Sequence, residues 1–147
     1  MEITYNINKS TEKNICHHLF KCDNNFIAQL SQRVDVQHFS KKIFEKSVTF
    51  EAWENGILIG LVSAYFNDVE NRFGYINNVS IIKKDMGKGI ANELLDMSIK
   101  YAVEHNFKEI KLEVSKNNFV AMKLYKKKGF YISKNEKDLF IMKLELG

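Results

Sequence analysis

The chain has 147 residues, a length that suits one domain with a sizeable core. Hydrophobic residues make up 45% and charged residues 27%, the balance of a water-soluble protein, and no apolar run approaches the roughly 20 residues that cross a bilayer. The net charge of +4 allows an anionic ligand such as a nucleotide cofactor, but it is too small to indicate nucleic-acid binding.

The N-terminus and the two cysteines predict a cytoplasmic protein without a metal site. Residues 1–9 are mostly polar and contain no apolar core of a signal peptide. Cys16 and Cys22 have neither the C-x-x-C spacing nor the matching histidine pair of a zinc site, which favours a reducing compartment. Four histidines without ligand or triad spacing are interpreted as surface residues: His17, His18, His38 and His105.

The first third of the chain predicts a short strand and two helices. The strand covers about residues 2–5, Thr11 is expected to cap the first helix, and the second helix follows Asp35. The connection between the helices, residues 26–33, is irregular and partly apolar. The predicted buried faces are Ile15, Cys16, Leu19 and Phe20 in the first helix, and Val36, Phe39, Ile43 and Phe44 in the second.

The middle third predicts an antiparallel meander of three strands. Residues 48–53 and 57–66 flank Asn55-Gly56, a pair that supplies the positive φ angles of a type I′ turn. A third strand is expected over residues 73–82.

The last part of the chain alternates helices and strands. A long helix follows Gly89, a strand covers residues 108–114, and a helix over residues 118–127 stops at Gly129. Residues 130–133 and 139–146 form a closing pair of strands. The apolar stripe of the long helix is Ile90, Leu94, Leu95, Ile99, Ala102 and Val103. This order predicts a single α/β domain of the α+β type over residues 1–147, with a mixed central sheet of about seven strands and about four helices.

One segment places a strand directly before a glycine-bearing turn and a helix start. Residues 79–91 read VSIIKKDMGKGIA. Unpaired backbone N–H groups and the positive end of the helix dipole meet at such a turn, so a phosphate or diphosphate is the expected occupant. Gly87 and Gly89 permit close approach of the backbone, and Lys83, Lys84 and Lys88 add positive charge. The same pattern also fits a turn with a purely structural role.

Two other phosphate-binding motifs do not fit this segment. A dinucleotide fingerprint requires a small residue three positions after Gly89, where Asn92 stands, and an early βαβ unit. A P-loop requires Gly-Lys-Ser/Thr, whereas Gly87-Lys88 is followed by Gly89. Both motifs are therefore excluded.

A second segment, residues 113–130, narrows the interpretation. It reads EVSKNNFVAMKLYKKKGF and resembles the closing motif of the GCN5-related N-acetyltransferases, the GNAT superfamily. The earlier turn is then similar to the acetyl-CoA loop of that family, Gln/Arg-x-x-Gly-x-Gly/Ala, with Lys84 in the Gln/Arg position. Lys84 keeps the charge but lacks the forked donors of Arg. The closing motif matches at Asn118, Ala121, Leu124, Tyr125, Gly129 and Phe130.

The resemblance implies the GNAT fold, in which two parallel strands splay apart and acetyl-CoA binds between them. On this chain the splayed pair is expected at residues 75–82 and 108–115. In the family the pantetheine arm pairs with the free strand edge, and the main-chain N–H of Val79 is expected to polarise the thioester carbonyl. The implied cofactor-binding residues are Val79, Ile81, Lys84, Met86, Gly87, Lys88, Gly89, Ile90, Ala91, Asn118, Ala121 and Tyr125.

The resemblance also implies acetylation of a primary amine by direct attack in a ternary complex. Tyr125 matches the family tyrosine that protonates the departing thiolate. Glu113 lies in a Leu-Glu-Val run that resembles the ribosomal-protein alanine acetyltransferase branch, where this glutamate serves as the base. Glu113 equally fits an exposed carboxylate paired with Lys111, and many relatives pass the proton to water.

The sequence leaves the acceptor open between a protein N-terminus and a small amine, such as an amino sugar, a polyamine or an amino acid. No membrane or nucleic-acid partner is expected, and the chain is predicted to act as a monomer or homodimer. Competing functions are a non-catalytic acetyl-CoA sensor and, because residues 126–132 partly match an RNP1 strand, an RNA-binding module. The expected acceptor-side residues are Arg33, Tyr65, Asn67, Tyr75 and Asn77.

Overall fold

The computed structural model describes residues 2–22 and 35–147. Seven strands form one sheet in the order β1-β2-β3-β4-β5-β7-β6, with β4 and β5 parallel and the other neighbours antiparallel. The strands are β1 (Thr4–Ile7), β2 (Val48–Glu54), β3 (Ile57–Asp68), β4 (Phe73–Ile81), β5 (Glu109–Ser115), β6 (Tyr131–Asn135) and β7 (Leu139–Glu145). The helices within the described ranges are α1 (Glu12–Cys22), α3 (Val36–Lys46), α4 (Ile90–Glu104) and α5 (Phe119–Lys127), and a 3₁₀ turn, η2, covers Lys83–Asp85. Over the described residues, the predicted mixed sheet and element order are confirmed.

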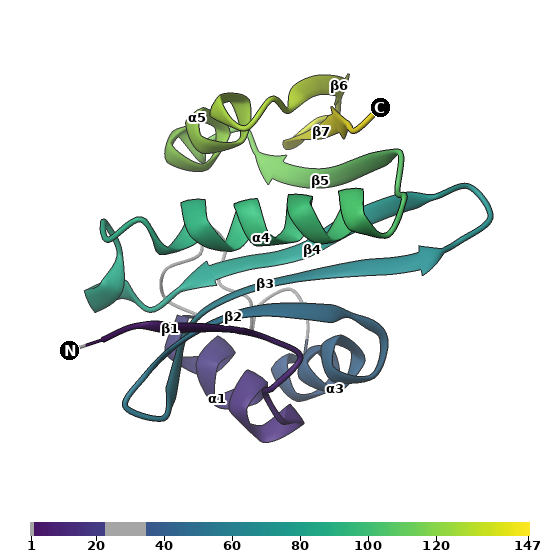
Figure 1. The fold of residues 1–147 in the computed structure, drawn as a ribbon. Coiled ribbons are helices and arrows are strands. Elements are labelled where there is room, and N and C mark those ends of the chain that lie inside the picture. The colour runs from purple at the N-terminus through teal and green to yellow at the C-terminus, as the bar shows by residue number, and fades with distance from the viewer. Residues whose placement is uncertain (1, 23–34) are drawn as a thin grey trace.

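Helices cover both faces of the sheet (Figure 1), and each face has its own core. The larger core joins α4 and α5 to the sheet and includes Leu94 and Tyr125. The smaller core lies under α1 and α3 and includes Ile15 and Ile43. Leu61 and Val62 are neighbours on β3 but belong to different cores, because successive side chains of a strand point to opposite faces.

The buried stripe of α1 differs from the predicted one. The N-cap is confirmed, since the N–H of Asn14 donates to Thr11 Oγ1 at 3.1 Å. The buried residues are Ile15, His18, Leu19 and Cys22, whereas Phe20 is 52% exposed. A helix turns by roughly 100° per residue, so Phe20 faces away from the stripe that these four positions share. His18 is only 1% exposed, and the prediction that it lies on the surface was wrong.

Two other predicted core residues also lie at the surface. Phe44 of α3 is 49% exposed and Val103 of α4 is 52% exposed. The turn predictions are confirmed: Asn55 and Gly56 have φ angles of 53° and 75°, and Gly129, at 105°, follows the end of α5. Positive φ angles at adjacent positions match the twist of the hairpin that they connect.

A buried carboxylate fixes the start of α1. Glu51 of β2 is 0% exposed and accepts hydrogen bonds from Ser10 N (3.0 Å), Ser10 Oγ (2.7 Å), Thr49 Oγ1 (2.6 Å) and Trp53 Nε1 (3.0 Å). A buried carboxylate requires such donors, because unpaired charge in the interior is costly. The network therefore holds the residues before α1 against the sheet.

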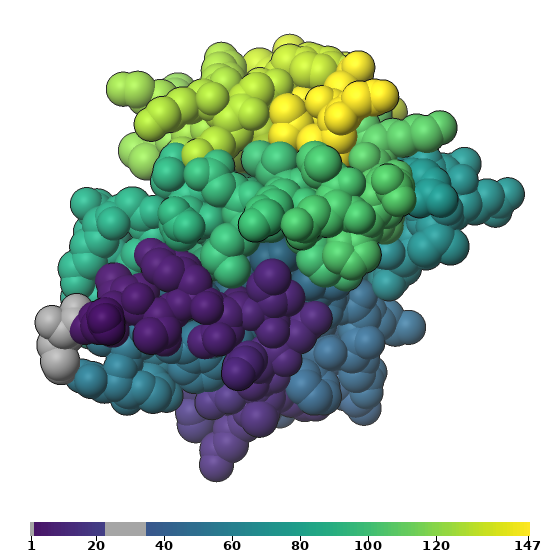
Figure 2. Space-filling view, in the orientation of Figure 1, coloured from purple at the N-terminus to yellow at the C-terminus, as the bar shows by residue number. Residues whose placement is uncertain are grey.

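The C-terminal and N-terminal helices occupy opposite ends of the molecule. Figure 2 shows the segment from α5 to β7, in yellow-green and yellow, at one end, and α1 and α3, in purple and blue, toward the other. None of the described helices is long and apolar enough to cross a membrane.

Candidate active site

The parallel strands β4 and β5 diverge toward their C-terminal ends (Figure 1). Their pairing runs from Phe73–Glu109 to Ile76–Leu112 and then stops, although β4 continues to Ile81 and β5 to Ser115. This confirms the predicted splayed pair. From Asn78 to Ile81, β4 is thus paired with β3 on one side and has separated from β5 on the other.

A β-bulge in β4 lies where the two strands part. Ser63 of β3 pairs with Asn78, and the residue after Ser63 pairs with Ile76, so Asn77 is the extra residue. Asn77 Nδ2 donates to Ser47 Oγ at 2.9 Å, and Ser63 Oγ donates to Asn77 Oδ1. Because a bulge bends its strand and increases the local twist, it accounts for the separation of β4 from β5.

Backbone alternation sets the direction of the main-chain groups on this stretch of β4. The N–H of Ile82 donates to Ile59 O on β3 at 2.9 Å. Successive N–H groups of a strand point to opposite sides, so those of Val79 and Ile81 point away from β3, toward the diverging strand β5. The main-chain N–H groups of the two residues predicted to contact pantetheine therefore point toward the space between the diverging strands.

The helix that follows β4 begins without a side-chain cap. Gly87 and Gly89 have φ angles of 84° and 78°, and Gly89 is the N-cap residue of α4. No side chain of the described residues forms a capping hydrogen bond at Gly89. The N–H groups of Ile90, Ala91 and Asn92 belong to the first helical turn, where no intrahelical acceptor exists. Main-chain donors and the helix dipole therefore meet at this point.

In the turn before α4, one main-chain N–H that was predicted to bind the cofactor is already hydrogen-bonded within the protein. The N–H of Met86 donates to Lys83 O at 3.2 Å, which closes η2. Of the main-chain donors predicted to bind an anion at this turn, those from Gly87 onward therefore remain candidates. Apart from its chain neighbours, a Cβ added at Gly87 or Gly89 would meet no atom of residues 2–22 and 35–147 within 4 Å, so these residues leave space for a ligand beside the turn.

Two lysines of the turn are held by a buried carboxylate. Asp85 has no exposed side-chain surface; Lys88 Nζ lies 2.9 Å from its Oδ1, and Lys84 Nζ lies 3.2 Å from its Oδ2 and 3.8 Å from Glu54 Oε1. Burial acts to raise the pKa of Asp85, but the hydrogen bond from Lys88 and the nearby positive charge of Lys84 outweigh burial and hold this pKa below its ordinary value. The cluster places two ammonium groups beside the start of α4, where a diphosphate would bind.

The second matched motif lies on α5. Asn118 is the N-cap of this helix, and its Oδ1 accepts from the N–H of Ala121 at 3.2 Å, which gives both residues a structural role. Tyr125 is 6% exposed, and its ring lies 5.9 Å from that of Phe130. Burial raises the pKa of Tyr125 to about 12. The phenol therefore keeps its proton at neutral pH and can act as a proton donor.

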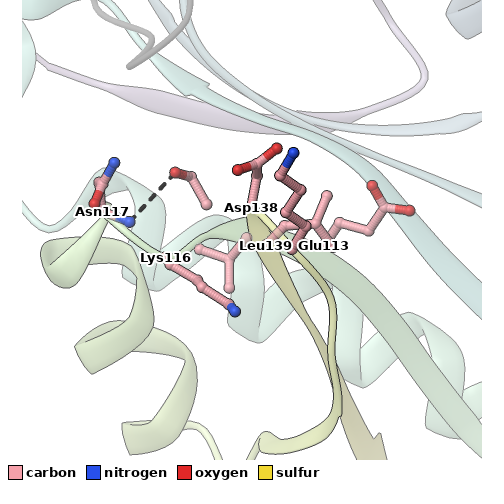
Figure 3. A pocket seen from close by; sticks show the side chains of 8 residues that line it. Glu113, Lys116, Asn117, Asp138 and Leu139 are labelled. Atoms are coloured by element: carbon pink, nitrogen blue, oxygen red, sulfur yellow. Dashed lines mark hydrogen bonds between the residues drawn. The ribbon is translucent and has the colours of Figure 1, made fainter.

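Glu113 lies on the opposite face of β5 from the buried Leu112 and Val114. It lines an open pocket of about 680 Å³ at the end of β5, together with Asp138 of the β6–β7 turn. Figure 3 shows both carboxyl groups on one side of the sheet, while Lys116 extends to the other side, where its Nζ lies 5.2 Å from the ring of Phe140. Within residues 2–22 and 35–147, Glu113 forms no ion pair, so the alternative pairing with Lys111 is absent.

The predicted acceptor-side residues lie on the face of the sheet that α1 and α3 cover. Tyr65 and Tyr75 pair across β3 and β4 with stacked rings 6.3 Å apart, and Lys42 Nζ lies 5.8 Å from the Tyr65 ring. Asn77 is the bulge residue, and Asn67 Nδ2 donates to Lys46 O at 3.0 Å. Arg33 and the connection over residues 26–33 lie outside the described residues.

Sequence reasoning missed a buried polar network beside the splay. His18 of α1 contacts Ser80 of β4, and Ser80 contacts Asn78, the residue after the bulge. The detectable signal was helical spacing, because position 18 shares one face with Ile15, Leu19 and Cys22.

Comparison with known proteins gives a consistent set of relatives. The sequence model described as the Acetyltransferase (GNAT) family matches residues 14–130. N-alpha-acetyltransferase MAK3 of Arabidopsis thaliana is 34% identical over 103 residues, which cover 65% of this chain and 54% of the relative. This chain thus spans about half the length of that relative.

Solved structures share the fold at low sequence identity. The ribosomal-protein-S18-alanine N-acetyltransferase of Escherichia coli has a TM-score of 0.81 at 16% identity and aligns over 99% of this chain and 95% of its own. The PaiA N-acetyltransferase of Thermoplasma acidophilum, solved in complex with coenzyme A, has a TM-score of 0.74 at 16% identity and 99% coverage of both chains.

Proposed function

This chain belongs to the GNAT acetyltransferase family, and we propose that it is an N-acetyltransferase that transfers the acetyl group of acetyl-CoA to a primary amine. Acetyl-CoA is the acetyl donor of the family. The observation that carries the proposal is the uncapped start of α4 beside the diverging edge of β4. The start of α4 offers an anion site for the diphosphate of acetyl-CoA, and the edge of β4 offers hydrogen-bonding groups for the amides of its pantetheine arm.

In this proposal, acetyl-CoA is bound mainly by main-chain groups and less by side chains. Val79 and Ile81 would pair with the pantetheine amides, and the N–H groups from Gly87 to Ala91 would bind the diphosphate. Lys84 and Lys88, held by Asp85, would add charge. The exposed Met86 would contribute its side chain only, since its N–H is engaged in η2.

The chemistry requires a polarised carbonyl and a proton donor for the leaving thiolate. The N–H of Val79 is assigned to the thioester oxygen, where negative charge develops during attack by the amine. Tyr125 is assigned to the thiolate, because a phenol with a pKa of about 12 remains protonated at neutral pH. The amine attacks directly, and no acetylated residue of the enzyme is required.

Glu113 is the proposed acceptor for the proton of the amine, directly or through water. Its carboxylate faces an open pocket on the side of the sheet opposite Leu112 and Val114. We place the acceptor there and on the adjoining surface of Tyr65 and Tyr75. A protein or peptide N-terminus is the first acceptor to test, because the names of two relatives specify N-terminal or alanine acetylation. Small amines are the second class, and a cytoplasmic location stays a prediction.

Thermal stabilisation tests the donor site. Acetyl-CoA and CoA at about 100 times Kd should stabilise the protein by about 2.7 kcal/mol, or roughly 5 to 15 °C in Tm, whereas ATP and NAD should not. Gly87→Glu should abolish the shift, because it puts a carboxylate into the anion site. Gly56→Glu is the matched control, since Gly56 has a similar φ of 75° and equally open surroundings in the β2–β3 turn.

Turnover separates the enzyme from a non-catalytic sensor. Thiol release from acetyl-CoA would be measured with a panel of N-terminal peptides and small amines. A protein that binds acetyl-CoA but acetylates no amine of the panel would be the sensor. Failure of CoA compounds to shift Tm would contradict the donor site itself.

A further inference from the structure

A chain of buried hydrogen bonds connects α1 to the stretch of β4 that carries Val79. His18 Nδ1 lies 2.8 Å from Leu58 O, and His18 Nε2 lies 2.9 Å from Ser80 Oγ. Asn78 Nδ2 donates to Ser80 Oγ at 2.9 Å and to Leu61 O at 3.2 Å. This series of hydrogen bonds thus starts and ends at carbonyl groups of β3, and the side chains between them come from α1 and β4.

The partners fix the direction of each hydrogen bond. The carbonyl of Leu58 only accepts, so His18 Nδ1 carries the proton of a neutral ring and Nε2 accepts from the Ser80 hydroxyl. Ser80 Oγ in turn accepts from Asn78. Burial lowers the pKa of His18 to about 4, so the ring stays neutral across the physiological range. His18, Ser80 and Asn78 are 1%, 6% and 7% exposed.

The network lies on the part of β4 that follows its last residue pair with β5. Asn78 and Ser80 flank Val79, and pairing with β5 has already ended at Ile76. Among the described strands, β3 is the pairing partner of this stretch, and the bulge at Asn77 adds an irregular step. The hydrogen bonds of Asn78 and Ser80 therefore hold the residues on both sides of Val79 to β3 and to α1.

Packing alone already attaches α1 to the sheet. Ile15 and Leu19 of α1 form an apolar cluster with Val36, Ile43 and Leu61, and every member is 3% exposed or less. A buried polar chain adds little to such an attachment, because its groups must first lose their hydration. Its specific effect is geometric, since satisfied polar networks favour one arrangement of the groups that they join.

We propose that His18 is a positioning residue which, through Ser80 and Asn78, holds the main-chain N–H of Val79 in the direction of the thioester carbonyl. The inference rests on the proposed function, in which that N–H is the donor to the carbonyl oxygen. Such a donor acts by being oriented before the reaction, so a small displacement lowers the rate without removing the binding site. CoA lacks the acetyl carbonyl and would not report this contact.

The ratio of two affinities tests the proposal. The Kd values of acetyl-CoA and CoA are measured by calorimetry, with kcat for a responsive amine, in the wild type and in Ser80→Ala. We expect CoA affinity to change by less than about two-fold, relative affinity for acetyl-CoA to fall several-fold, and kcat to fall by roughly ten-fold. Ser98→Ala is the control, because Ser98 is equally buried in α4 and bonds only locally to Leu95 O.

A pair of substitutions at His18 separates positioning from folding. Glutamine can place an amide near the position of Nε2 and still reach Ser80, whereas asparagine is too short and reaches only toward Leu58. We expect His18→Gln to retain most of kcat. His18→Asn should show the lowered kcat and the lowered relative affinity for acetyl-CoA that are expected of Ser80→Ala. Tm should fall in both His18 variants. If His18 had only a structural role, both variants would have a lower Tm, but the ratio of acetyl-CoA affinity to CoA affinity would stay at the wild-type value in each.

The outcomes distinguish the two proposals. A wild type that binds neither acetyl-CoA nor CoA would overturn the proposed function itself. A wild type that binds and acetylates normally, with unchanged affinity ratio and kcat in Ser80→Ala and His18→Asn, would overturn only the positioning role of His18.

Discussion

His18 is a residue whose burial makes folding depend on pH. Burial lowers its pKa to about 4 from an ordinary value of 6.5, so between these values the unfolded chain binds a proton that the folded chain does not. Stability from this group is therefore complete above pH 6.5 and declines as pH falls toward 4. The full difference is about 3 kcal/mol.

Urea unfolding at pH 7.5 and pH 5 measures this effect. The window lies above the ordinary pKa of carboxylic acids, which limits their contribution. His18→Gln should remove most of the decline between the two pH values, and His38→Gln, at an exposed position of α3, should leave it unchanged. An equal decline in the wild type and in His18→Gln would contradict the assignment.

Tyr125 combines burial with a predicted chemical role. Tyr125→Phe keeps the ring that packs against Phe130 and removes only the hydroxyl. We expect Kd for acetyl-CoA within about two-fold of the wild type and kcat lowered by roughly 10²-fold, the lower end of general acid catalysis. Tyr131→Phe is the control, because its hydroxyl bonds to Glu145 at the sheet edge. Unchanged turnover in Tyr125→Phe would remove the acid role.

At the scale of elements, the position of α4 depends on the absence of one side chain. A Cβ added at Gly60 of β3 would lie 2.7 Å from Ile90 Cγ2, 3.1 Å from Ile81 Cδ1 and 3.3 Å from Leu94 Cδ1. Ile90 is the first residue of α4, so this contact sets how closely the start of the helix approaches the sheet. The same helix start carries the proposed diphosphate site.

Gly60→Ala should therefore weaken donor binding as well as stability. Overpacking of this kind costs about 1–3 kcal/mol, and we expect it to displace the first turn of α4, because the closest contact is with Ile90. We expect KM for acetyl-CoA to rise by roughly three- to ten-fold. Gly74→Ala provides the comparison, because its Cβ would meet the Phe66 ring at 2.5 Å, at the other end of β4. A similar KM change in both variants would contradict a specific effect on α4.

At the scale of the whole molecule, the site is a gap between two halves of one sheet. Within the described part of the sheet, strand pairing connects β1 to β4 with β5 to β7 through four residue pairs, from Phe73–Glu109 to Ile76–Leu112. Lys128 Nζ lies 2.7 Å from Asp96 Oδ1 and connects α5 to α4 across the same junction. A ligand that pairs with β4 inside the gap should therefore stabilise the junction.

Amide hydrogen exchange with and without CoA tests this expectation. CoA should slow exchange at residues 79–81 and 87–91, through new hydrogen bonds and reduced local opening. The β2–β3 turn at Asn55 and Gly56 should be unaffected. Uniform protection across the chain would indicate general stabilisation, and no protection at residues 79–81 would contradict pairing with the strand edge.

Local rules of the sequence determined the elements and the glycine turn. The Asn55-Gly56 hairpin, the Thr11 cap, the order of strands and helices and the bare helix start after Gly89 all depend on neighbouring residues. Together with the resemblance of two motifs, these features were sufficient for the fold and the family. They were sufficient because turn angles, caps and periodicity are properties of short segments.

Only the tertiary structure decided the bulge, the buried network and the partners of the charged groups. Asn77 becomes an extra residue through its pairing with β3, and His18 is buried because α1 presents that stripe to the sheet. Asp85 holds Lys84 and Lys88 because the 3₁₀ turn over Lys83–Asp85 and the glycine turn that follows it bring both ammonium groups to one carboxylate. Helical spacing places His18 on the buried stripe of α1, but its partners Leu58 and Ser80 follow only from the folded structure. The bulge and the lysine contacts likewise depend on contacts between distant segments or on the geometry of a folded turn.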